Sequence, residues 1–439
     1  MHSQATETTI GIDTAIVADH CVAVRGATRQ DFTVAPTLAG MARLTERLAG
    51  HAPALVVAEP TGMTWLAVGY AAQAAGCLVS LVQPRHSARL RGAIAGKHKT
   101  DVIDADMLAG SVDVFGLTPT ALPSPTQIAL RRGVRRRHRA IVDAHRGECR
   151  LWALAAWAFP DIWHACGHSQ PLLQALLARW PHLRQLARAH TTSIAQLCHQ
   201  RLRRPGDADR RAERIRAMAA GWAGFWHDRV DLDALAWEVT ELLGDISDAD
   251  ARVDRAAAHA QRLWTGAYGD DELLTSIPGV GPTIAPIIRA WFGDATQFNH
   301  GKQAAAFVGL NPSNWESGLM AAPSRPITKE GPPELRLAFY QAANVARRHD
   351  PQLAAFYWRL MVQRSKTHIQ ANCAIARKLA TRTWATLTSG TPYEFRDLDG
   401  TPIDGSAAAE LAASWTVPTD VRRRARSHVA AFRRGRLAG

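Results

Sequence analysis

The chain has 439 residues, and its 52 Lys and Arg against 39 Asp and Glu give a formal net charge of +13. This length exceeds a typical domain of about 100 to 200 residues, so we expect two or three domains, and the excess of positive charge favours nucleic acid as a partner. Six scattered cysteines without a Cys-x-x-Cys pair argue against a disulfide framework or a zinc ribbon, and without a run of about 18 apolar residues we expect a cytoplasmic protein that makes no use of a membrane.

The first part of the chain, residues 1–123, alternates β-rich runs with helical segments. Strands are predicted at residues 9–12, 21–24, 55–58 and 77–82, and helices at 38–48 and 63–75. Because a helix joins the third and fourth of these strands, we expect the two strands to pair in parallel. The sequence therefore predicts an α/β domain here.

Four carboxylates in this domain form a candidate metal site. Asp13 ends the first predicted strand and Glu59 follows another, where side chains meet at the carboxyl edge of a parallel sheet. Asp101 and Asp104 are three residues apart on one face of a probable helix, whereas Asp106 lies off that face. Two hard cations such as Mg²⁺, about 4 Å apart, need several carboxylate ligands. Each acid taken alone also fits an ordinary cap or surface position.

Basic residues frame these acids. Arg85, Lys97 and Lys99 are predicted to bind phosphate, and Arg89 and Arg91 lie among them. An acidic centre within a basic frame is typical of nucleases. A sugar kinase of the actin-like type is disfavoured, because the sequence has no glycine-rich phosphate loop.

Residues 124–266 are predicted to be helical. Apolar residues recur there in alternating steps of three and four, as in a coiled coil: Leu232, Leu235, Val239, Leu242, Ile246, Ala249, Val253, Ala256, Ala260 and Leu263. This apolar stripe fits a helix packed within its own subunit, and it also fits a contact between subunits. Both interpretations stay open on the sequence alone.

Residues 267–390 are predicted to form a mostly α domain with a helix-hairpin-helix-like segment. In Ser-Ile-Pro-Gly-Val-Gly-Pro, Gly279 and Gly281 allow positive φ and exposed N–H groups that could bind phosphate. The neighbouring Lys302, Arg325 and Lys329 add positive charge. An ordinary connection between two helices is the alternative.

A serine-bearing loop follows, with Ser313, Ser317 and Ser324. Loop serines are mostly turn or capping residues, so spacing alone does not select a nucleophile. The basic tail, residues 391–439, either lies on phosphates or is solvated.

Several motifs resemble the insertion-sequence transposases of family one-hundred-ten, related to the Piv-type DNA invertases. These are GIDTA, AEPTG and KTDVIDA in the first domain, and SIPGVGP, FVGLNPS, ESG and RPITKEGPPELRLAFYQAA in the last. The resemblance covers about residues 9–380 and departs from the family at Thr328 and at Pro332-Pro333.

The resemblance implies a RuvC-like domain of RNase H type, with Asp13, Glu59, Asp101 and Asp104 as its DEDD ligands for Mg²⁺ in a two-metal site. It also implies that Ser317 is the nucleophile, that a covalent phosphoserine intermediate forms on donor or target DNA, and that a structured RNA from the element's own end guides the reaction. We expect a dimer or tetramer on DNA, with the apolar stripe as the subunit contact. The alternatives are a structure-selective endonuclease that uses water, and a non-enzymatic nucleic-acid scaffold.

Overall fold

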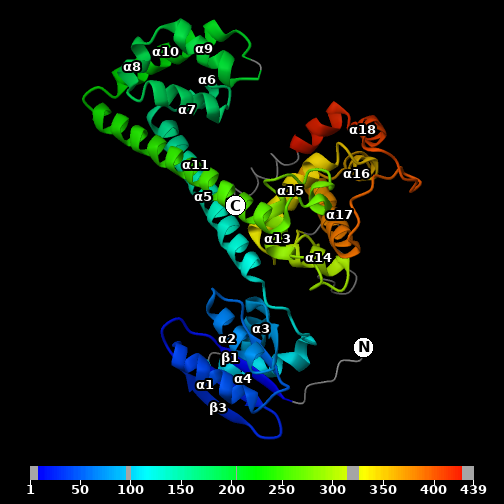
Figure 1. The fold of residues 1–439 in the computed structure, drawn as a ribbon. Helices are drawn as coiled ribbons and strands as arrows, with labels where there is room; N and C mark the ends of the chain where they lie inside the picture. The colour runs from blue at the N-terminus through cyan, green and yellow to red at the C-terminus, as the bar shows by residue number, and fades with distance from the viewer. Residues whose placement is uncertain (1–7, 95–99, 204, 314–325, 428–439) are drawn as a thin grey trace. The chain divides into compact units, whose positions relative to one another are not determined.

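The computed structural model describes residues 8–94, 100–203, 205–313 and 326–427 (Figure 1). The chain divides into two compact units, residues 1–124 and 125–439. The division lies at Ser124-Pro125, where the sequence predicts a helix start. The further domain boundaries proposed above remain predictions.

The first unit contains a five-stranded mixed sheet of order β3-β2-β1-β4-β5. β1 (Thr9–Asp13), β2 (His20–Arg25) and β3 (Gln30–Val34) pair antiparallel, and β1, β4 (Leu55–Ala58) and β5 (Leu78–Leu81) pair in parallel. The predicted parallel pairing of β4 and β5 is confirmed. β3 was not predicted, because most of its side chains are exposed and it lacks the apolar run of the other strands.

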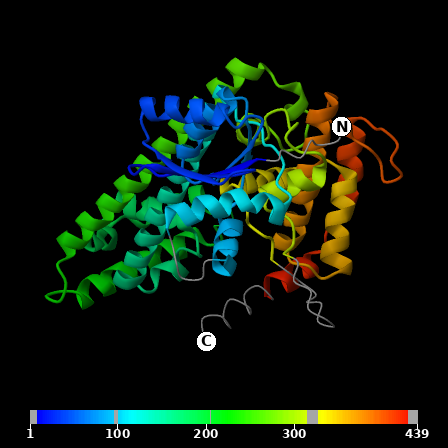
Figure 2. The same ribbon diagram turned by 90° about the horizontal axis from the view of Figure 1, so that it is seen from below.

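Helices cover both faces of this sheet (Figure 2). On one face, α1 (Leu38–Ala49) and α2 (Thr64–Ala74) bury residues such as Ile10 and Val56. On the other face, α4 (Asp101–Phe115) packs on the small residues Gly11 and Ala23. A Cβ atom on Gly11 would lie 1.9 Å from the carbonyl oxygen of Ala105, so α4 lies directly against β1.

Two long helices, α5 (Pro125–Ala158) and α11 (Leu232–Tyr268), form the centre of the second unit (Figure 1). They run antiparallel, since Gly133 lies beside Ala260 and Gly147 beside Ile246. The apolar stripe of α11 is largely buried within this unit. The stripe therefore packs largely within its own subunit, as the first of the two interpretations expects, and the subunit contact through it stays a prediction.

Each end of this helix pair enters a separate hydrophobic core. One core contains α6 (Ile162–Ala165), α7 (Gln170–Arg179), α8 (Leu183–Arg188), α9 (Thr191–Arg201) and α10 (Ala208–Phe225). The other contains α12 (Glu272–Thr275), α13 (Ala285–Phe292), α14 (Gly301–Val308), α15 (Pro333–Ala346), α16 (Pro351–Trp358), η1 (Arg359–Gln363) and α17 (His368–Ser389), after which α18 (Gly405–Ser414) packs on α16. In the described parts of both units, we find no helix with the length and apolar character that a membrane crossing needs.

Candidate functional site

The four predicted acids come from three elements that meet at one edge of the sheet. Asp13 is the last residue of β1, and Glu59 comes directly after the parallel neighbour β4. Asp101 and Asp104 lie in the first turn of α4, which begins where the Thr100 side chain accepts a hydrogen bond from the Ile103 N–H at 3.3 Å. Because α4 packs on β1, this turn is brought to the end of β1 that carries Asp13.

The electrostatics of Asp13 show that the four acids lie close together. Burial of this carboxyl raises its pKa to about 6, and the negative charges of Asp104, Asp101 and Glu59 add to the rise, while Arg91 opposes it. Carboxylates that repel one another in this way are stabilised by a cation between them. Their oxygen atoms fit a hard divalent ion such as Mg²⁺.

Two side chains of α3 (Pro84–Ile94) occupy part of this acidic cluster. The Arg91 Nε donates to Asp104 Oδ1 at 2.7 Å, and the Asp104 side chain is only 4% exposed. The Ser87 hydroxyl, one helical turn before Arg91, donates to Glu59, whose other oxygen accepts from the Thr61 hydroxyl at 3.1 Å. Sequence reasoning missed Ser87, although its spacing of four from Arg91 places both on one helix face.

This arrangement explains why the acids are close without forming a ligand set. Among the described residues, no group of three or more His, Cys, Asp or Glu side chains is arranged to hold a metal ion. Glu59 and Asp104 instead accept hydrogen bonds from Ser87 and Arg91 of α3. The donor chemistry fits a divalent metal, and a metal that used Oδ1 of Asp104 would have to replace the contact of that oxygen with Arg91.

Asp106 lies outside the cluster, as the helix geometry predicts. Arg25 of β2 donates to both of its carboxylate oxygens, at 2.9 and 2.7 Å, and Arg29 lies 3.2 Å away. These contacts lower the pKa of Asp106. Asp106 therefore joins α4 to the β2–β3 hairpin and has a structural role.

Of the predicted phosphate-binding residues in this unit, Arg85 is exposed on α3. Its pKa is lowered by partial burial and by Arg89, one turn further along the helix. Lys97 and Lys99 lie outside the described residues. Their predicted role stays a prediction.

Two family models match the chain and together cover more than half of it. A transposase model for the DEDD domain of IS110 elements matches residues 10–160, and the model of the IS116/IS110/IS902 transposase family matches residues 271–358. The chain belongs to the IS110 family of transposases. The first match contains all four acids, and residues 161–270, which include all of α6 to α11, lie between the two matches.

Individual relatives of this IS110-family chain are similar over different lengths. The pilin gene-inverting protein of Moraxella lacunata is 34% identical over 125 residues, which are 28% of this chain and 38% of that protein. The 43.6 kDa protein of insertion element IS110 from Streptomyces coelicolor is 26% identical over 339 residues, or 74% of this chain and 79% of that protein. The transposase of element IS1111A from Coxiella burnetii is 30% identical over 156 residues, 35% of this chain and 39% of its own length. The match thus spans about two fifths of the Moraxella relative.

The glycine hairpin of this transposase-family chain lies in the second unit, between α12 and α13. Gly279 has φ +85°, and a Cβ there would lie 2.4 Å from the Ala342 carbonyl oxygen of α15. Gly279 thus uses the positive φ that a glycine allows, whereas the φ of Gly281 lies outside the left-handed region. Since the N–H of Val280 donates to Ile277 within the turn, packing on α15 explains much of the motif. Phosphate binding by the hairpin stays a prediction.

The two ends of the serine-bearing segment are joined by a short antiparallel bridge between Pro312 and Ile327. The Ser313 N–H and hydroxyl both contact the Pro326 carbonyl oxygen, at 3.0 and 3.1 Å, so Ser313 has a structural role. Ser317, Ser324 and Arg325 fall within residues 314–325, outside the described residues.

Two predicted phosphate-binding lysines remain in the described part of the second unit. Lys302 is exposed in the first turn of α14, and Lys329 is exposed with φ +57°. The Lys329 N–H donates to the Gly309 carbonyl at 3.1 Å, which fixes the backbone after the bridge. Both positions are accessible to a polyanion.

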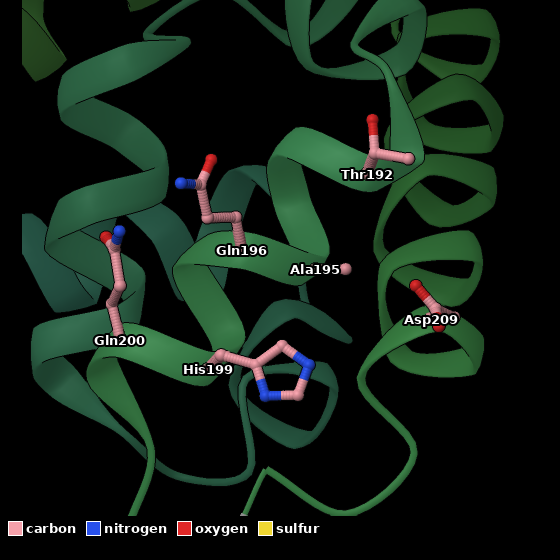
Figure 3. A pocket seen from close by; sticks show the side chains of 6 residues that line it. All are labelled: Thr192, Ala195, Gln196, His199, Gln200 and Asp209. Atoms are coloured by element: carbon pink, nitrogen blue, oxygen red, sulfur yellow. The ribbon is translucent and has the colours of Figure 1, made fainter.

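A separate pocket of about 450 Å³ lies on α9 and the start of α10 (Figure 3). Thr192, His199 and Asp209 line it, but no hydrogen bond joins these three in the described structure. A nucleophile, base and orienting acid would need such bonds. The pocket therefore provides no catalytic triad.

Proposed function

We propose that the chain is the transposase of a mobile insertion sequence and that it cuts and rejoins DNA strands at a metal site formed by Asp13, Glu59, Asp101 and Asp104. The observation that carries this proposal is the convergence of three carboxylates, those of Glu59, Asp101 and Asp104, on Asp13, whose pKa rises to about 6. Family membership supports it, as do the relatives named as transposases and as a gene-inverting protein.

In this proposal the acids bind Mg²⁺, which would neutralise charge on the reacting phosphate. The carboxylate form of Asp13 is stabilised most by such a cation, because this side chain is partly buried and lies near three other acids. Ser87 holds Glu59 in place through its hydrogen bond, and Arg85 contacts DNA phosphate. A nuclease of this type needs the basic frame as well as the acidic centre, because DNA must approach a negatively charged site.

Ser317 is the proposed nucleophile. Its Oγ forms a bond to a DNA phosphorus while the bond from that phosphorus to the leaving strand breaks. The serine gives up its proton, and the departing strand oxygen takes up one. Attack by a second strand oxygen then reverses these changes and joins the strands. Guidance by the element's own RNA and assembly as a dimer or tetramer complete the proposal, both carried by the family resemblance.

The test is a search for a covalent protein–DNA adduct. The full chain, its element-end RNA and labelled donor DNA are incubated with Mg²⁺ and analysed under denaturing conditions. We expect an adduct that Ser317→Ala abolishes, whereas Ser313→Ala, which changes a structural serine of the same segment, retains it. Cleaved ends without an adduct, unchanged in Ser317→Ala, would show that water is the nucleophile and that the enzyme is a hydrolytic endonuclease.

A further inference from the structure

The arginine-rich run at the start of α5 is used in two different ways. Arg131 and Arg135 pack on Trp291 of α13. Their guanidinium groups lie 4.8 and 4.9 Å from the centre of its ring. Arg131 also donates to the Ala290 carbonyl at 2.7 Å, and Arg135 pairs with Glu334 at 3.5 Å. These two arginines therefore stabilise packing.

Arg136 points elsewhere, into a cleft of about 180 Å³ between α5 and α11. Arg252, Arg255 and His259 of α11 line the same cleft, with Gly133 and Ala256 beside them. None of the described residues that line it is acidic. The nearby Asp254 lies instead close to Arg137, where its charge partly offsets the lowering of the Arg137 pKa by burial.

Three guanidinium groups in one cleft repel one another, and this repulsion lowers the stability of the helix pair. The antiparallel packing of α5 on α11 places the three arginines along one cleft, where Arg136 and Arg255 are exposed and Arg252 is half-buried. A bound anion turns the repulsion into attraction. Guanidinium groups bind phosphate through two parallel N–H bonds, which makes phosphate a better match than a carboxylate on a flexible chain.

We propose that Arg136, Arg252 and Arg255 form a binding site for a backbone phosphate of nucleic acid. The inference rests on the proposed function for the presence of nucleic acid, and it adds a contact remote in sequence from the four acids. Arg252 and Arg255 lie between the two family matches, so family membership does not assign this role. The phosphodiester of DNA and that of RNA have the same chemistry here.

The test measures binding of the full chain to labelled single-stranded RNA, single-stranded DNA and duplex DNA of element-end sequence, from about 50 to about 200 mM salt. The variant is Arg252→Gln with Arg255→Gln. The matched control is Arg146→Gln with Arg150→Gln, which removes the same charge from exposed positions of α5 outside the cleft. Thermal unfolding confirms that each variant is folded.

We expect the cleft variant to lose about tenfold in affinity at low salt, and its plot of log affinity against log salt to be less steep by about one to two, for at least one nucleic acid. The nucleic acid that shows the loss supplies the phosphate. A cleft variant that binds all three probes like the control would overturn the proposal while leaving the metal site untouched. A wild-type chain that binds none of them would contradict the proposed function as well.

Discussion

At the scale of single residues, the contact between Arg91 and Asp104 is the feature that most affects the candidate metal site. A buried carboxylate without a cation is costly, and Arg91 provides a cation for Asp104 at 2.7 Å. A divalent ion must replace this contact to use the same oxygen. Arg91 is therefore both a stabilising residue and a competitor of the metal.

Arg91→Ala tests this double role. We expect the metal-free variant to be less stable by about 1 to 3 kcal/mol, because Asp104 loses its partner in a buried position. We also expect Mn²⁺ to raise the melting temperature of the variant by more than that of the wild type, since no salt bridge has to be broken. Thermal unfolding with and without Mn²⁺ measures both effects.

Arg89→Ala is the matched control, because Arg89 is an exposed arginine on the same helix. It should change neither the metal-free stability nor the response to Mn²⁺ by more than a small amount. If Arg91→Ala responded to Mn²⁺ no more than the wild type does, the competition between arginine and metal would be refuted.

At the scale of elements, the close packing of α4 on β1 brings the acids together. Gly11→Ala should disrupt it, because the added Cβ would lie 1.9 Å from the Ala105 carbonyl oxygen and backbone must move. We expect a loss of at least about 1 to 3 kcal/mol in the free energy of unfolding, the usual cost of overpacking. Denaturant unfolding measures it.

Gly92→Ala controls for the loss of a glycine, since its Cβ would meet nothing within 4 Å. In a helix this change should be neutral or stabilising by up to about 1 kcal/mol. Equal stability of the Gly11→Ala variant and the wild type would mean that α4 and β1 are not in the tight contact described above.

Some of these elements could be predicted from the sequence, and others could not. The apolar runs of β1, β2, β4 and β5 predicted the strands and the parallel edge where Asp13 and Glu59 lie. β3 was not predicted, because its side chains are mostly exposed and it has few apolar residues. The contacts of Ser87 with Glu59 and of Arg91 with Asp104 depend on how α3 packs, which no local pattern encodes. The apolar stripe of α11 was visible, but its partner α5 lies about a hundred residues earlier in the chain, so only the fold identified it.

At the scale of the whole molecule, the basic residues behind the net charge of +13 have different roles. Some arginines satisfy acids, as Arg25 does for Asp106, and others support packing, as Arg131 does on Trp291. Arg136, Arg252 and Arg255 line one cleft, and no acidic side chain is among the described residues that line it. An excess of basic residues favours nucleic acid as a partner, but it does not say which arginines would contact the nucleic acid.

The most direct test of the account is the rate of Mg²⁺-dependent cutting of element-end DNA by Asp13→Asn, Glu59→Gln, Asp101→Asn and Asp104→Asn, with DNA binding measured beside it. We predict that each change lowers the cutting rate by at least about a hundredfold while DNA binding persists, because each removes one of the proposed metal ligands. Asp106→Asn, on the same helix but bonded to Arg25, should stay within a fewfold of the wild type. Cutting at the wild-type rate by the four acid variants would contradict the metal site and the function built on it.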